Sequence, residues 1–335
     1  MNELIIKLAK KEGISDIHIQ TGLPVAIRVN GLIEKIDNEI AKKEDVTKLI
    51  KSILNPTQQK RLAAEKSFDV GFTQKGIRFR GNIFETQSGT NIVFRILDEE
   101  IRSFSEMNFP PVIEETLLKQ NGLILVTGPT GSGKTSSIAS MIEYLNQNTQ
   151  KNIITIEDPI EYVFKPEQSI ISQREVGDHA LSFQDALRSA LREDPDVILV
   201  GELRDLETVS LALTAAETGH LVFATLHTSG AANTINRIVD VFPPEQQAQV
   251  RQQIAVSLKL AITQRLIRKM DGSSRIPAFE VMVCNVAIQN LIREGKIFQI
   301  PNVLQTSSGD GMVQMKQSID TLKADGIISY DEESE

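Results

Sequence analysis

Residues 128–135 read Gly-Pro-Thr-Gly-Ser-Gly-Lys-Thr, and this octapeptide constrains the fold more than any other part of the chain. It matches the phosphate-binding pattern GxxxxGK[ST]. The apolar run at 123–126 precedes it and predicts a buried strand, and a helical pattern from Ser136 to Leu145 follows it. A strand, a glycine-rich turn and a helix in this order direct backbone N–H groups and a helix N-terminus toward a phosphate.

The residue types of this loop suit the binding of phosphate groups. Glycines leave the N–H groups accessible because no Cβ stands in the way. We expect Lys134 to reach the β- and γ-phosphates, and the hydroxyl of Thr135 to ligate Mg²⁺. The residues expected to contact the nucleotide are Gly128, Thr130, Gly131, Ser132, Gly133, Lys134 and Thr135. The sequence therefore predicts a protein that binds and hydrolyses a nucleoside triphosphate.

The pattern along the chain predicts two domains and an α/β fold. Residues 1–98 combine helical and strand patterns, as in a small α+β domain, and 99–111 form a linker that ends in a double proline. From 112 to 335 strands alternate with helices, which predicts a parallel sheet, and the chain is expected to be mostly helical after Pro244. A chain of 335 residues is long enough for two such cores.

Apolar alternation, apolar runs and turn residues locate the individual elements. In the first domain the spacing of Leu4, Ile5, Leu8 and Ala9 predicts a helix. We also expect strands at 16–20, 25–29, 68–72, 77–83 and 91–97, a hairpin turn at Asn30-Gly31, and a helix at 45–54. In the second domain we expect strands at 123–127, 153–157, 197–201 and 221–226, and helices at 182–192 and 206–218.

Composition excludes several classes of protein. The net charge of −8 and the absence of Trp argue against a general nucleic-acid-binding surface. No apolar run approaches the roughly 18 residues that span a bilayer, and the N-terminus lacks the features of a signal peptide. The single cysteine, Cys284, rules out an internal disulfide and is expected in the core. We therefore expect a soluble, cytoplasmic protein.

Polar residues follow three of the expected strands at their carboxyl ends, where ligands bind in an open parallel sheet. They are Glu157 to Glu161, Glu202, and His227 with Thr228. Hydrolysis needs a base or water-positioning group and a Mg²⁺ shell, for which Glu161 and Glu202 are the candidate carboxylates. Gly201 stands where an aspartate often ends such a strand, so the pattern leaves open which carboxylate binds Mg²⁺ directly.

Arginines are the candidate partners of the γ-phosphate. Arg78 and Arg80 share one face of an expected strand, and Arg95 lies on the next strand. These side chains either reach a nucleotide across a subunit boundary or form a solvated basic face. Arg188 and Arg192, four residues apart on an expected helix, either serve the same purpose or pair with nearby acids.

Four segments of the chain together resemble the secretion ATPase superfamily that powers type II secretion and type IV pili. Residues 15–31 are similar to the start of the PAS-like N-terminal domain of that family. Residues 156–161, 191–202 and 218–228 resemble its Asp box, Walker B region and His box, in the right order. The resemblance covers nearly the whole chain and implies a RecA-like ATPase core.

Within the superfamily the chain most resembles the branch of pilus retraction ATPases. The assembly branch commonly carries a tetracysteine motif and an additional N-terminal domain, whereas this chain has one cysteine and only about 110 residues before the core. Residues 287–294 nearly match the retraction branch's segment AIRNLIRE, with Gln289 in place of its first arginine. An assembly or type II secretion ATPase is the alternative, and a nucleic-acid translocase is a weaker one.

The resemblance also implies roles for individual residues and partners. Glu161 would be the general base, Glu202 would act near Mg²⁺, and His220 and His227 would sense or position the site. Arg80 and Arg95 would contact the nucleotide of a neighbouring subunit in a ring hexamer. ATP and Mg²⁺ are the implied cofactors. The implied partner is a platform protein of the pilus at the cytoplasmic face of the inner membrane, with no stable nucleic-acid partner.

A short helix is expected at residues 287–294, with Asn285 as its N-cap and Gly295 just beyond its end. The apolar stripe comprises Ala287, Ile288, Leu291 and Ile292; the opposite face comprises Gln289, Asn290, Arg293 and Glu294. By its pattern this is a surface helix packed on the core. The resemblance assigns it a role in coupling hydrolysis to movement.

Overall fold

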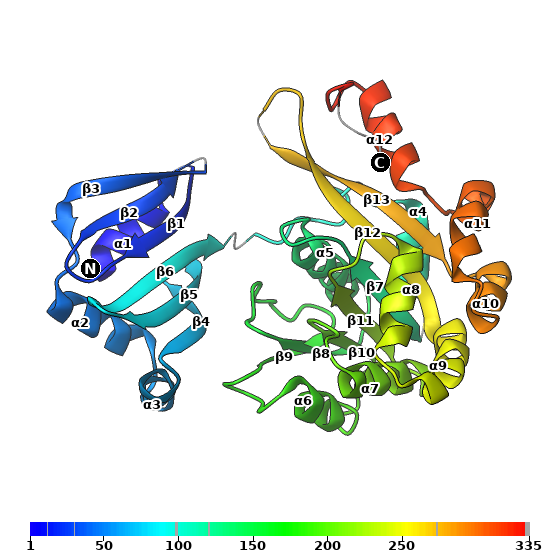
Figure 1. Cartoon of the computed structure of the whole chain (residues 1–335), viewed down its shortest axis with the longest axis horizontal. Helices are drawn as coiled ribbons and strands as arrows, with labels where there is room; N and C mark the ends of the chain where they lie inside the picture. The colour runs from blue at the N-terminus through cyan, green and yellow to red at the C-terminus, as the bar shows by residue number, and fades with distance from the viewer. Residues whose placement is uncertain (12, 30, 98–99, 120, 273, 332–335) are drawn as a thin grey trace. The chain divides into compact units, whose positions relative to one another are not determined.

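The computed structural model describes the chain except for residues 12, 30, 98–99, 120, 273 and 332–335 (Figure 1). Asn30 of the expected hairpin turn and the start of the expected linker lie outside the described residues. The chain divides into two compact units. The first comprises residues 1–100 and 159–163, and the second comprises residues 101–158 and 164–335.

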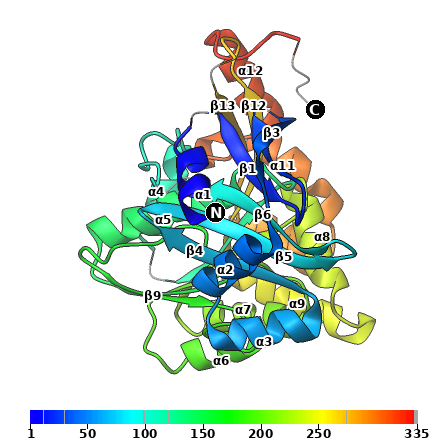
Figure 2. The same cartoon turned by 90° about the vertical axis from the view of Figure 1, so that its left-hand side faces the viewer.

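The first unit is built on a six-stranded sheet in the order β3-β2-β1-β6-β5-β4, with every neighbouring pair antiparallel. Its strands are β1 (Ile14–Ile19), β2 (Pro24–Val29), β3 (Leu32–Ile40), β4 (Ser67–Gln74), β5 (Ile77–Thr86) and β6 (Gly89–Leu97). Its helices are α1 (Asn2–Ala9), α2 (Lys43–Ile53) and α3 (Pro56–Glu65). Helix α1 packs against β1, α2 against β6 and α3 against β4 (Figure 1, Figure 2).

The five strands expected in the first unit are confirmed, with small shifts at their ends, and two elements were not expected. Strand β3 is exposed along almost its whole length, so its sequence lacks the apolar alternation that marks a half-buried strand. Helix α3 has a weak apolar stripe, but its N-cap Asn55 and its third residue Gln58 form a reciprocal capping box around Pro56. That capping box was the sequence signal for α3.

The second unit is built on a seven-stranded mixed sheet in the order β13-β12-β7-β11-β10-β8-β9. Its strands are β7 (Gly122–Thr127), β8 (Asn152–Glu157), β9 (Ile170–Glu175), β10 (Val197–Val200), β11 (Leu221–Leu226), β12 (Leu258–Arg268) and β13 (Arg275–Val283). All neighbours are parallel except β12 and β13, which form an antiparallel hairpin at one edge.

Helices pack on this sheet and extend beyond its edge (Figure 1). They are α4 (Pro111–Leu117), α5 (Lys134–Asn148), α6 (Phe183–Ala190), α7 (Leu206–Glu217), α8 (Ala231–Asp240), α9 (Pro244–Ser257), α10 (Val286–Arg293), α11 (Ile300–Thr306) and α12 (Met315–Ala324). Two short 3₁₀ turns lie at Ile297–Gln299 and Ser308–Asp310.

The expectation of a mostly helical chain after Pro244 is wrong for residues 258–283. Strand β12 is buried over most of its length, and its buried residues include the polar Thr263 and Gln264. Its sequence therefore lacks the regular apolar and polar alternation that identifies a half-buried strand. The hairpin also corrects the expectation of a purely parallel sheet. Strand β9, an edge strand with only one fully buried residue, was not expected either.

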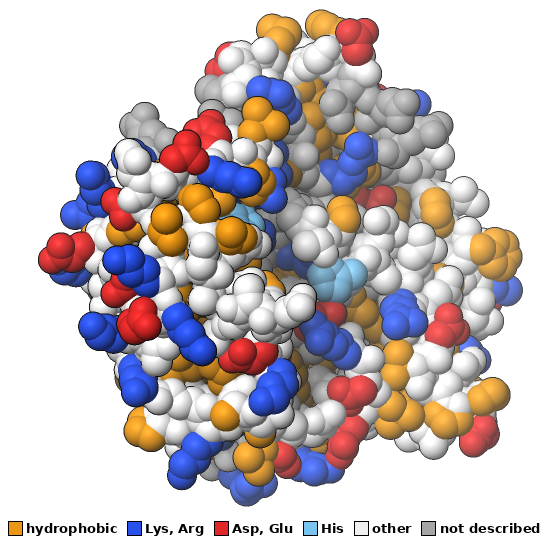
Figure 3. All heavy atoms as spheres, turned by 60° about the vertical axis from the view of Figure 1, so that its left-hand side comes forward, with side chains coloured by type: hydrophobic (Ala, Val, Ile, Leu, Met, Phe, Trp, Pro, Cys, Tyr) orange, Lys and Arg blue, Asp and Glu red, His pale blue; other side chains and the backbone are white. Residues whose placement is uncertain are grey.

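The surface agrees with the charge pattern of the sequence. On the face drawn in Figure 3, Lys and Arg side chains are interspersed with Asp and Glu rather than gathered into one basic area. Among the residues that the structure describes, no helix is long and apolar enough to cross a membrane. Cys284 is buried as expected, and burial raises the pKa of its thiol to about 12.

Candidate functional site

The phosphate-binding loop joins β7 to α5, as the sequence predicts. Helix α5 begins at Lys134, and its N-cap is Gly133, whose φ of 87° lies in the left-handed region. No side chain caps the first N–H groups of this helix. The N-terminus of a helix, at the positive end of its dipole, is a favourable site for an anion. The local fold of the loop is therefore suited to hold a phosphate group.

Two of the three loop glycines are required by space as well as by backbone conformation. A Cβ at Gly128 would collide with the carbonyl oxygen of Gln264 and lie 2.7 Å from Ser132 Oγ. A Cβ at Gly133 would lie 2.9 Å from Gln264 Nε2. Gly131 has a φ of 80° but open space around the position of a Cβ. The close approach of β12, which carries Gln264, therefore fixes the shape of the loop.

Lys134 lies over the loop that precedes it. Its Nζ donates hydrogen bonds to the carbonyl oxygens of Gly128 at 2.8 Å and Pro129 at 3.1 Å. The same nitrogen lies 3.5 Å from Nδ1 of His227, at the carboxyl end of β11. The lysine thus stands between the phosphate loop and the neighbouring strand.

His227, Glu202 and Arg204 extend this contact to a third strand. His227 Nε2 lies 3.2 Å from Glu202 Oε1, and an Arg204 terminal nitrogen lies 2.6 Å from Glu202 Oε2. The hydrogen bond to Glu202 raises the pKa of Arg204. We call Lys134, His227, Glu202 and Arg204 the polar chain. Arg204 was not expected, although its position two residues after Glu202 was the available signal.

The remaining expected residues of the second unit lie in different surroundings. Thr135 and Thr130 are exposed at the loop, whereas Ser132 is buried. His220 precedes β11 and contacts the carbonyl oxygen of Ala215 at 2.9 Å. The six residues of β11 separate it from His227 by about 20 Å of strand. The structure therefore does not bring His220 to the edge where His227 lies.

Glu157 is a buried carboxylate at that edge that was not singled out as a site residue. It ends β8 and is 7% exposed. Its Oε1 accepts hydrogen bonds from Thr155 Oγ1 at 2.6 Å and Gln173 Nε2 at 3.3 Å. These bonds fix the orientation of the carboxylate at the end of the strand next to β10.

In the first unit, Arg80 and Arg95 lie directly opposite each other on β5 and β6. Arg95 Nε donates to Asp16 Oδ1 at 2.9 Å, and Arg80 lies 3.6 Å from Glu161 Oε1. Burial opposes ionisation of Asp16, but hydrogen bonds from Ser15 and Arg95 outweigh it and lower the pKa. Like charges opposite each other destabilise a sheet, and the two carboxylates offset this repulsion. Glu161 therefore lies among first-unit residues.

Arg188 and Arg192 make local contacts. Arg188 forms an ion pair with Glu207 at the start of α7, rather than with the nearby Asp185. Arg192 donates to the carbonyl oxygen of Arg188 at 2.8 Å. Of the two alternatives for Arg188, pairing with an acid is therefore observed, and the acid is Glu207.

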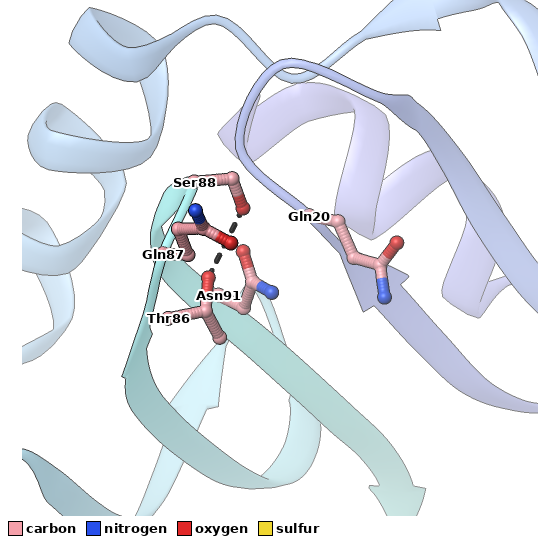
Figure 4. A pocket seen from close by; sticks show the side chains of 5 residues that line it. All are labelled: Gln20, Thr86, Gln87, Ser88 and Asn91. Atoms are coloured by element: carbon pink, nitrogen blue, oxygen red, sulfur yellow. Dashed lines mark hydrogen bonds between the residues drawn. The ribbon is translucent and has the colours of Figure 1, made fainter.

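A shallow pocket of about 450 Å³ lies in the first unit (Figure 4). It is lined by Gln20, Thr86, Gln87, Ser88 and Asn91. Asn91 Oδ1 accepts from the backbone of Thr21 at 3.0 Å, and Thr86 and Ser88 are bonded to each other at 3.0 Å. All five lining side chains are neutral, so this pocket offers neither an acid nor a base for catalysis.

The geometry of the loop makes a testable distinction between two of its glycines. We expect Gly128→Ala to weaken nucleotide binding by at least tenfold, because the new Cβ collides with the β12 backbone. Gly131→Ala is the control, since Gly131 also has a positive φ, 80° against 141° at Gly128, but a Cβ there meets no other atom. Titration with a fluorescent ADP analogue measures both. Equal affinities for the two variants would show that the packing against β12 does not shape the loop.

Comparison with known proteins places this chain in a family. Residues 1–318 match the family model described as type II/IV secretion system protein. The type IV pilus retraction ATPase PilT of Pseudomonas aeruginosa is 45% identical over 326 residues, which cover 97% of this chain and 94% of that protein. A twitching motility protein of Neisseria gonorrhoeae is 47% identical over 90% of this chain and 81% of its own length.

Solved structures support the same family assignment. A crystal structure of the pilus retraction motor PilT with bound ADP superposes with a TM-score of 0.90 at 46% identity, covering 99% of this chain and 95% of that one. The ATPase DotB of Legionella pneumophila superposes with a TM-score of 0.80 at 32% identity, covering 98% of this chain and 92% of that one. With its phosphate loop, its polar chain and this likeness over nearly its whole length, the chain belongs to the type II/IV secretion system protein family.

Proposed function

We propose that this protein is an ATP-driven motor that retracts type IV pili. The observation that carries the proposal is the polar chain beside the phosphate loop, on a fold shared over nearly its whole length with retraction ATPases. The reaction is attack of water on the γ-phosphorus of ATP, with breakage of the bond to the β-phosphate oxygen. Catalysis of this step rests mainly on positioning and on stabilising charge.

The second unit supplies the groups that bind and stabilise the phosphates. The N-terminus of α5 and Lys134 would hold the β- and γ-phosphates. Two buried polar atoms beside the loop, Ser132 Oγ and Gln264 Nε2, lack a hydrogen-bond partner among the described residues. Buried polar groups without a partner are uncommon in folded proteins, and they suit a site completed by a polar ligand. His227, which contacts both side chains, would keep Lys134 and Glu202 at a fixed separation.

Mg²⁺ is the proposed metal, and the donor set at the loop fits it. The hydroxyl of Thr135 and the carboxylate of Glu202 are hard oxygen ligands of the kind that Mg²⁺ prefers. The described residues contain no cluster of three or more metal-binding side chains. That suits an ion that takes most of its ligands from water and substrate phosphates. When bound, Mg²⁺ would offset the negative charge that develops on the phosphate oxygens.

We further propose that the protein works as a ring hexamer. Two observations support this: Arg80 and Arg95 share one face of the first-unit sheet, and the Arg95 side chain is 65% exposed. In the proposed ring, these arginines contact the nucleotide of a neighbouring subunit, and Glu161 acts as general base. The two proposed domains, a PAS-like domain at 1–98 and a RecA-like core at 112–335, would then move against each other during turnover.

Helix α10 is the proposed coupling segment to a platform protein at the cytoplasmic face of the inner membrane. Asn285 caps α10 by accepting from the Ile288 N–H at 3.1 Å, as expected. The apolar stripe is narrower than expected, since Ile288 and Ile292 are buried but Ala287 is exposed. Asn290 is exposed and accepts a hydrogen bond from Arg293 at 3.1 Å, which leaves a polar face available for a partner.

Lys134→Ala tests the function directly. We expect ATP turnover to be lost and twitching to fail in a strain that carries only this variant, because the variant removes charge from the phosphates. Circular dichroism should be unchanged. The matched control is Lys48→Ala, which removes an exposed lysine of α2. Release of inorganic phosphate is the measurement, and undiminished release by a folded Lys134→Ala protein would refute the proposal.

Mixed rings test the contact between subunits. We expect Arg95→Ala and Glu161→Gln each to lower hydrolysis, the latter by about a hundredfold for a lost general base. Mixing the two variants should restore part of the activity, because some interfaces then combine an intact Glu161 with an intact Arg95. Mixed rings that form but stay inactive would contradict a role for Arg95 in trans. The same measurement applies to Arg80.

The polar face of α10 separates hydrolysis from movement. We expect Asn290→Ala combined with Arg293→Ala to leave ATP turnover and ring formation intact while retraction fails. Arg61→Ala with Glu65→Ala, which removes an exposed ion pair of α3, is the control. Twitching of a strain carrying each pair of substitutions is the measurement. Normal twitching in the α10 variant would remove this helix from the coupling mechanism.

A further inference from the structure

Glu280 of β13 caps a helix that begins beside the nucleotide site. Its Oε1 accepts a hydrogen bond at 2.9 Å from the N–H of Ala231, the first residue of α8. The N-cap of α8 is Gly230, which has no side chain to serve as a local cap. The cap therefore comes from a strand 49 residues away in the sequence.

This carboxylate is held where its charge is unfavourable. Burial raises the pKa of Glu280, and the hydrogen bond from Ala231 opposes this shift only in part. The Ala231 N–H is the one hydrogen-bond partner found for the carboxylate within the described part of the chain. A neutral side chain would fill the same space without the cost of burying a charge. The contribution of the carboxylate is therefore its hydrogen bond to the start of α8.

The loop that Glu280 holds leads directly to the polar chain. Only residues 228–230 separate His227 from Ala231. Within this short connection, Thr228 Oγ1 is bonded to Thr234 Oγ1 at 2.7 Å, and Asn233 donates to the carbonyl oxygen of Ser229 at 2.9 Å. The loop is thus anchored on α8, and its other end carries the imidazole that contacts Lys134 and Glu202.

The strand that carries Glu280 is also tied to the phosphate loop. Glu280 lies opposite Thr263 on β12. Thr263 Oγ1 is bonded at 3.0 Å to Thr127 Oγ1, and Thr127 is the last residue before the loop. One sheet edge therefore fixes both the start of the phosphate loop and, through Glu280, the start of α8.

We propose that Glu280 is a positioning residue for ATP hydrolysis, which sets His227 at its distance from Lys134 by anchoring the start of α8. The proposal rests on the proposed function only in assigning His227 to the nucleotide site. It adds a residue that lies far along the sequence from the phosphate loop, the Asp box, the Walker B region and the His box. Loss of the anchor moves the imidazole without altering the groups that bind phosphate.

The test compares Glu280→Leu, which removes the acceptor, with Glu280→Gln, which keeps an acceptor oxygen. We expect Glu280→Leu to lower kcat by about tenfold to a hundredfold, as misplacement of a catalytic group does, with unchanged affinity for ADP. Glu280→Gln should retain most of the wild-type kcat. In the His227→Ala background, Glu280→Leu should cause no further loss, since residues that act through each other are not additive.

A measurement made without nucleotide tests the anchor independently of the proposed function. Hydrogen exchange of the backbone amides of residues 228–234 should accelerate in Glu280→Leu and stay near wild type in Glu280→Gln. Asn55→Ala, which removes the cap of α3 in the first unit, is the control and should leave both kcat and this exchange unchanged. If Glu280→Leu does not fold, Glu280→Ala serves as the second variant without an acceptor.

Each outcome decides one question. Faster exchange with a normal kcat, or additive losses with His227→Ala, would overturn the positioning role. Unchanged exchange would overturn the anchor itself. If His227→Ala leaves hydrolysis intact while exchange accelerates in Glu280→Leu, the anchor stands, and both the assignment of His227 to the site and the positioning role of Glu280 are refuted.

Discussion

The contacts of Lys134, His227 and Glu202 beside the phosphate loop depend on the order of three parallel strands, β7-β11-β10. Parallel neighbours present their carboxyl ends at one edge, so residues far apart in the sequence meet there. Lys134 follows β7, His227 follows β11 and Glu202 follows β10, and each contacts the next at 3.5 Å and 3.2 Å. Were β11 placed elsewhere in the sheet, the lysine and the carboxylate would have no imidazole between them. The chemistry of the site is thus a consequence of strand order.

This part of the fold was readable in the sequence because the central strands are continuous apolar runs bounded by polar residues. The strands β7, β8, β10 and β11 and the polar residues at their ends were all expected. The hairpin β12–β13 was not, since a strand buried along its length loses the alternation that identifies strands. Arg204 was missed because it follows the strand by four residues and acts through Glu202 rather than through a motif of its own.

His220 shows where sequence position and spatial position separate, and Glu161 shows a contact that only strand pairing reveals. Both belong to segments that resemble nucleotide-binding boxes. His220, however, lies at the amino end of β11, where it contacts the end of α7. Glu161 lies beside Arg80, on a segment that groups with the first unit. Arg80 lies opposite Arg95, and Arg95 lies opposite Asp16, because of the register in which the strands pair. The spacing of residues along a single strand does not reveal which residues of two strands lie opposite each other.

Helix caps show the same division between local and distant information. Asn285, Ser182 and Asp205 each cap the helix that follows them within three residues, so the sequence identifies these caps without a structure. Glu280 caps α8 from another strand, and no local pattern announces it. A local cap stabilises one helix alone, whereas a distant cap also fixes the helix relative to the sheet. The strand-borne cap from Glu280 serves the helix whose preceding loop carries His227, so it ties that loop to the same sheet that carries the phosphate loop.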